Sequence, residues 1–255
     1  MTLLHANAPR ALILAAGRGK RLMPLTKNIP KCLVRVGRKP ILYYQLSALR
    51  KYGVAEIVVI AGYKENAIRE YVQKEFPEFK TIFVSNPKYE TTEDIYSLYL
   101  AKNYLDEDCL LLDSDVLFHH SIIGKLLTVT PYLSYTAIKK VPCGEEEMKA
   151  SVDKNGMVTK LSKELVPSET AGEFLSITFF RKPFLKHLVC AMRKTINSTG
   201  KKTYATVAIE KVISDGKGKL ACLDITSYPA MEIDFPSDLK IATEQVLPKI
   251  AQELL

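Results

Sequence analysis

In residues 11–31 the chain reads ALILAAGRGKRLMPLTKNIPK. The apolar run Ala11–Ala16 stops at Gly17, which predicts a buried strand that ends in a tight loop. Because Gly17 and Gly19 stand one residue apart, the backbone can turn sharply there and bring its N–H groups close to an anion. Basic residues accompany the glycines, among them Arg18, Lys20, Arg21 and, ten positions later, Lys31. The stretch therefore predicts a loop that holds a polyphosphate.

Two well-known phosphate loops are excluded by spacing. A Walker A loop places Ser or Thr after its lysine, whereas Lys20 is followed by Arg21. A dinucleotide-binding loop needs a third glycine where this chain has Leu22, and an acidic residue about 20 positions later, where residues 33–36 read LVRV. An ordinary turn with solvated charges is the remaining alternative. It would explain Gly-x-Gly alone, but not the longer pattern that extends to Lys31.

Composition is that of a globular protein with one domain, or one domain and a subdomain. The chain has 255 residues, of which 47% are apolar and 25% charged, with a formal net charge of +8. Its lysines are scattered, with no block of five basic residues, so a basic pocket for phosphorylated substrates explains the charge. Nucleic-acid binding is not favoured.

The cysteines form neither a disulfide pattern nor a zinc-binding pattern. They are odd in number and far apart, at Cys32, Cys109, Cys143, Cys190 and Cys222. We expect small buried apolar side chains in a reducing cytoplasm. No apolar run approaches 18 residues and the first residues do not resemble a secretory signal, so no membrane insertion is expected. The number of subunits stays open, and a homo-oligomer is compatible with the sequence.

Strands and helices alternate in the first half of the chain. Strands are expected over 11–16, 56–61, 81–85 and 108–113, and helices over about 40–53, 64–74 and 95–103. This alternation predicts a three-layer α/β fold with a mostly parallel sheet. Ligands of such sheets bind beyond the carboxyl ends of the strands, where Gly17 and Asp113 both lie.

After residue 140 the pattern changes. Strands over 149–152 and 157–161 flank a turn at Asn155-Gly156, and further elements are a strand over 174–180, a helix over about 182–196, a polar loop over 197–202, a helix over 205–214 and a strand over 220–224. We expect one domain, with a nucleotide-binding part over about 11–140, an inserted acceptor-binding part over about 141–235 and a C-terminal helix over 236–255.

Two acidic motifs lie far apart in the sequence. Residues 110–115 read LLLDSD, which places Asp113 and Asp115 at the end of a buried strand, and residues 231–234 read MEID. A hydrophilic turn would also explain the first motif. However, Mg²⁺ binds through one or two carboxylates together with substrate phosphates, so the motif is also a candidate metal site.

The pattern Gly17-x-Gly19-x-Arg21-Leu22-x-Pro24-Leu25-Thr26-x-x-x-Pro30-Lys31 resembles the signature of the sugar-phosphate nucleotidyltransferase superfamily. These enzymes join an NTP to a phosphorylated small molecule and release pyrophosphate. The resemblance implies a Rossmann-like three-layer fold with a mostly parallel mixed sheet and a small inserted acceptor-binding lobe. It also implies that Arg21 offsets charge on the departing pyrophosphate and that Lys31 reaches the phosphates. Attack on an α-phosphorus builds negative charge, so cationic side chains are what this chemistry needs.

The same resemblance implies a Mg²⁺ site with Asp115 and Asp234 as ligands and with Asp113 and Glu232 in supporting positions. It implies that the nucleotide is bound by the strand end and loop, with further contacts from later segments. These candidates are Leu14, Ala15, Ala16, Gly17, Arg18, Gly19, Lys20, Gly62, Tyr63, Ser97 and Asp113.

Residues 86–101, NPKYETTEDIYSLYLA, are similar to a segment of bacterial cytidylyltransferases of the phosphocholine and 2-aminoethylphosphonate type. The similarity implies CTP as the nucleotide and argues against the alternative, a UTP- or dTTP-dependent sugar-1-phosphate enzyme. One departure is Glu93-Asp94, where the family often has an Asn-Asn pair, so the pyrimidine or ribose contacts at this position stay open. A non-catalytic nucleotide-sensing subunit is disfavoured because Arg21, Lys31, Asp115 and Asp234 are all present.

Residues 161–163, LSK, resemble a Ser-Lys pair in the inserted lobe, which implies that Lys163 holds the phosphate or phosphonate of the acceptor. A surface lysine is the alternative. A quaternary ammonium group calls for an aromatic cage, but the chain has no tryptophan, and Tyr204 is the aromatic residue expected near the pocket. Glu173 could pair with a primary amine. These residues favour an aminoethylphosphonate-like acceptor over phosphocholine.

Overall fold

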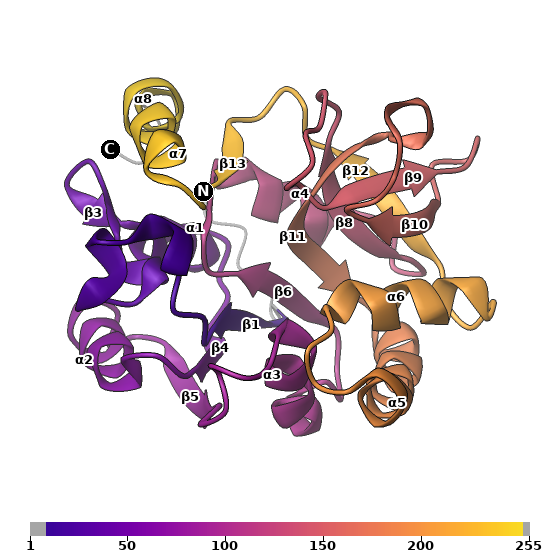
Figure 1. Cartoon of the computed structure of the whole chain (residues 1–255), viewed down its shortest axis with the longest axis horizontal. Coiled ribbons are helices and arrows are strands. Elements are labelled where there is room, and N and C mark those ends of the chain that lie inside the picture. Colours follow the sequence, from indigo (N-terminus) through magenta and orange to yellow (C-terminus); the bar gives the residue numbers. More distant parts are fainter. Residues whose placement is uncertain (1–8, 252–255) are drawn as a thin grey trace. The chain divides into compact units, whose positions relative to one another are not determined.

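The computed structural model describes residues 9–251 (Figure 1). Its internal contacts divide the chain into two compact units. The first unit comprises the residues up to Glu90, Leu112–Lys125 and the residues from Tyr228 onward, and the second comprises Thr91–Leu111 and Leu126–Ser227. Within residues 9–251, every helix is too short or too polar to span a bilayer.

The first unit contains three parallel strands, β1 (Arg10–Ala15), β4 (Glu56–Ala61) and β5 (Lys80–Ser85), paired in the order β1-β4-β5. The last five residues of β1 and of β4 are all buried. Such continuous apolar strands are typical of parallel sheets covered on both faces. The longer helices of this unit are α1 (Ile41–Lys51) and α2 (Glu65–Glu75).

Shorter elements complete the first unit. The loop after β1 contains three 3₁₀ turns, over Lys20–Leu22, Leu25–Lys27 and Lys31–Leu33, and the pair β2 (Arg35–Val36) and β3 (Lys39–Pro40) follows. Strand β7 (Val116–Phe118) pairs antiparallel with β13 (Ala230–Glu232). The C-terminal region consists of α7 (Pro236–Ile241), a π-helical turn over Ala242–Val246 and α8 (Leu247–Ala251).

One apolar cluster joins these distant segments of the first unit. Its buried members are Leu22, Val34, Val36, Ile41, Tyr44, Leu117, Ile233, Ala242 and Ile250. They come from the loop after β1, from α1, from β7 and from the chain around and after β13. Burial of this apolar surface therefore fixes the loop against the two later segments.

The second unit contains the remaining elements. These are α3 (Asp94–Leu100), most of β6 (Cys109–Asp113), β8 (Ser134–Lys139), β9 (Lys149–Val152), β10 (Val158–Ser162), β11 (Gly172–Phe180), α5 (Lys182–Thr199), α6 (Ala205–Ser214) and β12 (Leu220–Asp224), with α4 (Ser121–Thr128) shared between the units. Strands β9 and β10 form an antiparallel hairpin, β11 pairs antiparallel with β8 and β9, and β12 is parallel to β8.

The mixed, mostly parallel sheet with helices confirms the predicted fold class. The strand over 56–61, the hairpin over 149–161 and the helix over 205–214 also lie where they were predicted. Several elements were missed, namely the 3₁₀ turns, β2, β3, β7, α4, β8 and β13. The predicted C-terminal helix is present in three segments as far as Ala251, and residues 252–255 lie outside the described residues.

Three details of the prediction were wrong. The predicted loop over 197–202 is helical as far as Thr199, because the hydroxyls of Ser198 and Thr199 bond back to the carbonyls of Lys194 and Thr195 and so do not break the helix. Helix α3 ends at Leu100 and a 3₁₀ turn follows, so the helix predicted to residue 103 is shorter. The third detail concerns burial, because only Cys32 and Cys109 are fully buried, whereas the other cysteines are partly exposed.

Candidate active site

The loop after β1 has a strict requirement for glycine at one position. Gly19 has a φ of +65°, a conformation that side chains rarely adopt. A Cβ atom there would lie 2.9 Å from Cβ of Lys31, so the Lys31 side chain can pass only because Gly19 has none. Thr26 Oγ1 also donates a hydrogen bond to the Gly19 carbonyl, at 2.7 Å. Gly17 is different, since its φ is not positive and open space lies beside it. The sharp turn predicted from both glycines therefore depends on Gly19 alone.

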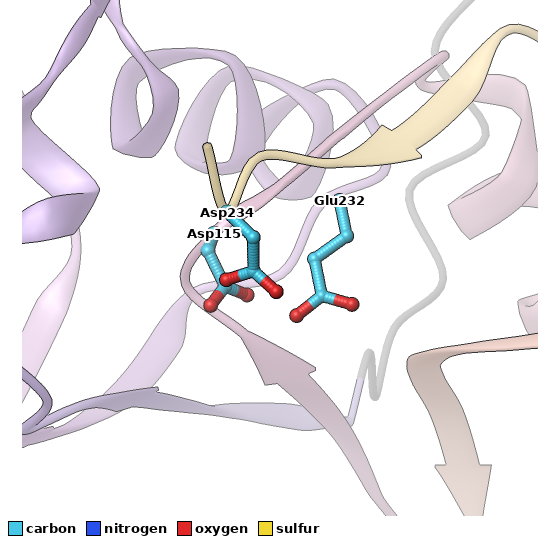
Figure 2. Close-up of side chains that lie close together, drawn as sticks. All are labelled: Asp115, Glu232 and Asp234. Carbon is cyan, nitrogen blue, oxygen red and sulfur yellow. The ribbon is translucent and has the colours of Figure 1, made fainter. Parts of the chain in front are cut away.

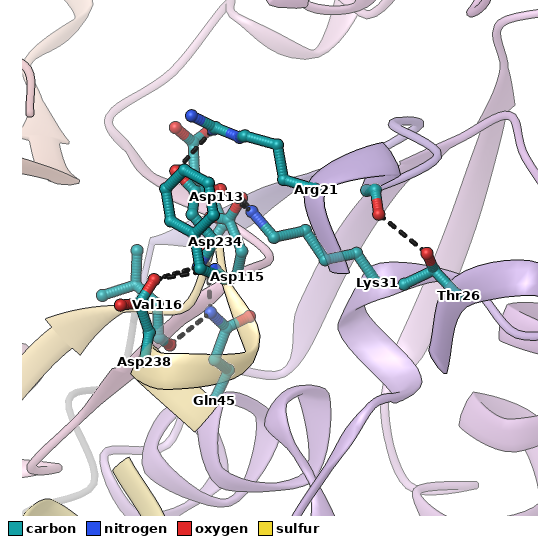
Figure 3. Close-up of polar contacts among 11 residues, drawn as sticks. Arg21, Thr26, Lys31, Gln45, Asp113, Asp115, Val116, Asp234 and Asp238 are labelled. Atoms are coloured by element: carbon teal, nitrogen blue, oxygen red, sulfur yellow. Dashed lines mark hydrogen bonds and ion pairs between the residues drawn. The ribbon is translucent and has the colours of Figure 1, made fainter. Parts of the chain in front are cut away.

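Lys31 lies between two carboxylates from distant parts of the chain (Figure 3). Its Nζ atom is 2.5 Å from Oδ2 of Asp115 and 2.5 Å from Oδ1 of Asp234, and Arg21 donates to the other Asp234 oxygen, also at 2.5 Å. The side chains of Lys31, Asp115 and Asp234 are only 12%, 20% and 14% exposed. The four residues predicted as catalytic or metal-binding thus form one cluster within the first unit.

Backbone pairing explains why the two aspartates meet. The amide of Ile233 donates to the carbonyl of Asp115 at 3.0 Å, next to the β7–β13 ladder in which Val116 is opposite Glu232. The segment then turns away at Asp234, because α7 begins two residues later.

That turn is held by a residue that the sequence analysis missed. Asp238 Oδ2 accepts hydrogen bonds from the amides of Asp234 and Phe235, at 2.9 and 2.8 Å. Pro236 at the first helical position and an acidic residue two positions later are typical of a helix start, and this signal could have identified the cap.

Glu232 joins the same group of carboxylates (Figure 2). Asp115, Glu232 and Asp234 each offer an oxygen, and these atoms lie within 4.8 Å of one another. The second oxygen of Asp115, Oδ1, is buried and has no hydrogen-bond partner among the described residues. Carboxylate oxygens are what Mg²⁺ binds, so this donor set fits a magnesium ion. Glu232 belongs to this donor set, whereas the sequence analysis gave it only a supporting position beside the ligands Asp115 and Asp234.

The charges in the cluster are strongly coupled. Burial, reinforced by the negative charges of Asp115 and Asp234, raises the pKa of Glu232 to about 9. Burial alone would lower the pKa of Lys31, but the three carboxylates outweigh it and the pKa of Lys31 is raised. Lys31 is therefore an ammonium ion at neutral pH. Additional positive charge would favour the ionised form of Glu232.

Gly62 and Tyr63, predicted to contact the nucleotide, contact the loop after β1 from the end of β4. The buried Tyr63 hydroxyl donates to the carbonyls of Thr26 and Lys27, at 3.1 and 2.5 Å, and the Tyr63 amide donates to Ala16 at 3.0 Å. Gly62 is tightly packed, because a Cβ there would lie 2.9 Å from the Ala16 carbonyl oxygen.

The other nucleotide candidates occupy varied positions. Leu14–Ala16 are buried at the end of β1, and Lys20 is exposed in the loop. The Arg18 guanidinium lies 5.3 Å from the Tyr63 ring centroid. Asp113 ends β6. Ser97 is buried on α3, in the second unit.

The Glu93-Asp94 departure also lies in the second unit. Asp94 Oδ1 accepts a hydrogen bond from the Ala205 amide at 2.9 Å, at the start of α6. This carboxylate therefore caps a helix.

Two of the three acceptor candidates lie together in the second unit. Lys163 Nζ is 5.8 Å from the Tyr204 ring centroid and 3.8 Å from Oε2 of Glu146. Glu173 is the second residue of β11, opposite Lys149 of β9 and Lys139 of β8.

Comparison with known proteins identifies the relatives of this chain. Residues 10–138 match the family described as nucleotidyl transferase. The CTP:phosphoglutamine cytidylyltransferase of Campylobacter jejuni is 27% identical over 92% of this chain and 99% of its own length. The choline-phosphate cytidylyltransferase of Streptococcus pneumoniae is 30% identical over 74% of this chain and 77% of its own length.

A third relative is larger. The CMP-5'-(3-aminopropyl)phosphonate synthase of Streptomyces rubellomurinus is 28% identical over 96% of this chain, which spans only 40% of that protein. Among solved structures, the inositol-1-phosphate CTP transferase of T. maritima has the same fold, with a TM-score of 0.80, 22% identity and coverage of 96% of this chain and 97% of its own. The match to the family covers half of the chain and includes the loop after β1, with Arg21 and Lys31. The chain therefore belongs to the nucleotidyl transferase family and is a nucleotidyltransferase.

Proposed function

We propose that this chain is a Mg²⁺-dependent cytidylyltransferase that couples CTP to a small phosphorylated or phosphonylated alcohol or amine and releases pyrophosphate. The observation that carries the proposal is the cluster of Lys31 and Arg21 with three carboxylates. Support for CTP comes from the relatives, because the three described above are named for CTP, for CMP or for cytidylyl transfer.

The reaction needs charge stabilisation more than proton transfer. An acceptor oxygen attacks the α-phosphorus, a new P–O bond forms, and the bond to the departing pyrophosphate breaks. A phosphate or phosphonate dianion is already ionised at neutral pH, so no general base is required. Arg21 and Lys31 stabilise the negative charge that grows on the phosphates. A magnesium ion held by Asp115, Glu232 and Asp234 would draw further charge from the α-phosphate.

The acceptor residues belong to the proposal as well. We assign the nucleotide to the part of the chain over about 11–140 and the acceptor to the part over about 141–235. Lys163 supplies a cation for the phosphate or phosphonate group of the acceptor, and its partner Tyr204 offers an aromatic face. Glu173 supplies a carboxylate for a primary amine. An acceptor of the 2-aminoethylphosphonate type fits this set better than phosphocholine, because a cage for a quaternary ammonium would need more aromatic residues.

Pyrophosphate release tests the proposal. CTP, UTP, ATP, GTP and dTTP are each combined with 2-aminoethylphosphonate, (3-aminopropyl)phosphonate, phosphocholine, phosphoethanolamine, inositol-1-phosphate and glucose-1-phosphate, with Mg²⁺ or with EDTA. We expect turnover with CTP, with a non-sugar acceptor and only with Mg²⁺. Turnover restricted to UTP or dTTP with glucose-1-phosphate would contradict the proposal and support a sugar nucleotidyltransferase.

Two variants test the site itself. Lys31→Ala and Asp115→Asn should each lower turnover by about 10²-fold or more, because each removes a charge that acts on the phosphates or on the metal. Lys74→Ala is the matched control, since Lys74 is exposed on α2 and takes no part in the cluster. Near-normal turnover in both site variants would contradict the assignment.

A further inference from the structure

Gln45 is a completely buried polar side chain in the middle of α1, with an exposed fraction of 0%. Its Nε2 atom donates two hydrogen bonds, each of 2.8 Å, to the carbonyls of Asp113 and Val116 (Figure 3). These carbonyls flank the two residues Ser114 and Asp115. Gln45 therefore closes both ends of the turn that carries Asp115.

The chemistry of the two acceptors fixes the orientation of the Gln45 amide. Two carbonyl oxygens can be met only by the NH₂ group, so Oε1 faces away from them. This oxygen is buried and has no hydrogen-bond partner within the described part of the chain. An unpaired buried polar atom costs about 1–3 kcal/mol. The fold tolerates that cost at a position where the same side chain donates two hydrogen bonds to one turn.

The rest of the turn is held from other directions. The Ser114 amide donates to the carbonyl of Leu14 at 3.2 Å, and the Asp115 carbonyl accepts from the Ile233 amide at 3.0 Å. With the bonds from Gln45, backbone groups of all four residues over 113–116 are bound. Since the backbone is fixed, the direction of the Asp115 carboxylate is restricted, with Oδ2 on Lys31 and Oδ1 buried and unpaired among residues 9–251.

We propose that Gln45 is a positioning residue that aims the Asp115 carboxylate at the cation through the backbone of this turn. The inference rests on the proposed function, because it gives Asp115 the role of a metal ligand. Gln45 acts through Asp115. Asparagine is one methylene too short to keep both bonds without movement of α1 or the turn, and glutamate has the right length but no donor.

The test compares Gln45→Met with the unaltered chain. Methionine has a similar volume, but it donates no hydrogen bond, so the carbonyls of Asp113 and Val116 lose this donor. We expect about 10- to 100-fold weaker binding of Mn²⁺ or Mg²⁺ in calorimetry without nucleotide, and a similar loss of kcat at limiting Mg²⁺ that excess Mg²⁺ partly restores. Ser47→Ala is the matched control, because this buried hydroxyl on the same helix has no partner among the described residues. It should leave both quantities unchanged.

The outcomes separate this inference from the proposed function. A folded Gln45→Met variant with unaltered cation affinity and kcat would overturn the positioning role. If the unaltered chain releases no pyrophosphate, the proposed function fails, while the calorimetric comparison still tests Gln45. Gln45→Asn replaces Gln45→Met if the latter does not fold. Failure of both to fold would also overturn the inference, because Gln45 would then be required for the fold as a whole.

Discussion

Replacement of Lys31 by methionine should make the stability of the protein depend on a divalent cation. Lys31→Met keeps most of the side-chain volume but leaves Asp115 and Asp234 without the ammonium ion that lies 2.5 Å from each. Removal of one partner from a fully buried ion pair costs about 3–5 kcal/mol, and an exposed pair is worth about 0–1 kcal/mol. Side chains that are 12–20% exposed lie between these limits, so we expect a loss of about 2–3 kcal/mol in EDTA.

Mg²⁺ should restore most of the lost stability of Lys31→Met, because it can occupy the position between the carboxylates of Asp115 and Asp234. A ligand at 100 times its Kd stabilises the folded state by about 2.7 kcal/mol. In the unaltered chain Lys31 competes with the ion for the same carboxylates, so Mg²⁺ should stabilise it less than it stabilises Lys31→Met. Urea unfolding of both proteins, in EDTA and in Mg²⁺, measures the difference, with Lys74→Met as the control. The reasoning is refuted if Lys31→Met is as stable as the unaltered chain in EDTA, or if Mg²⁺ stabilises both equally.

Three further predictions follow from single contacts. Gly19→Ala should abolish pyrophosphate release and lower the free energy of unfolding by at least about 1 kcal/mol, because Gly19 has a positive φ and a Cβ there would clash with the Lys31 side chain. In urea unfolding, Gly17→Ala should leave the free energy of unfolding unchanged, since Gly17 has neither constraint. Equal losses of stability in the two variants would contradict this reasoning. Burial raises the pKa of Asp94 to about 7, above its ordinary 3.8, so the native state binds the extra proton and stability falls as pH rises from about 4 to 7. Asp94→Asn should reduce that fall by up to about 4 kcal/mol in urea unfolding at several pH values, and an unchanged slope would argue against it. Asp238→Ala should lower the stability measured by thermal unfolding by about 0.5–2 kcal/mol. It should also weaken Mn²⁺ binding, because the Asp234 amide loses its hydrogen-bond acceptor. Unaltered Mn²⁺ affinity would show that this cap does not position Asp234.

The parts of the fold that were predicted correctly depend on local sequence. The strand over 56–61 is a continuous apolar run, and the turn at Asn155-Gly156 is a local hairpin signal. Strand β7 was missed because its three residues carry no pattern of their own, and its partner β13 follows more than 100 residues later. Pairing of that kind is set by tertiary contacts, which periodicity does not report.

The residues of the candidate site also divide into those that local sequence predicts and those that depend on tertiary contacts. The roles of Arg21, Lys31, Asp115 and Asp234 were implied by the resemblance to the nucleotidyltransferase superfamily, whose motifs are local in sequence. Gln45 was not predicted, because one glutamine in an amphipathic helix is normally solvent-exposed, and only the structure shows it inside. The proximity of Glu232 to Asp115 was not predicted, because it depends on the register between β7 and β13.

The positions of the charged residues at this site depend on the apolar cluster of the first unit. Each charged residue stands close in sequence to a buried member of that cluster, with Arg21 next to Leu22, Asp234 next to Ile233 and Asp115 two residues before Leu117. Carboxylates that repel one another would separate if their segments were free to move. Leu22, Leu117 and Ile233 are each completely buried, and each full burial contributes about 1.5–3 kcal/mol. The hydrophobic effect thus holds Asp115 and Asp234 close together, in the arrangement that we propose for binding a cation.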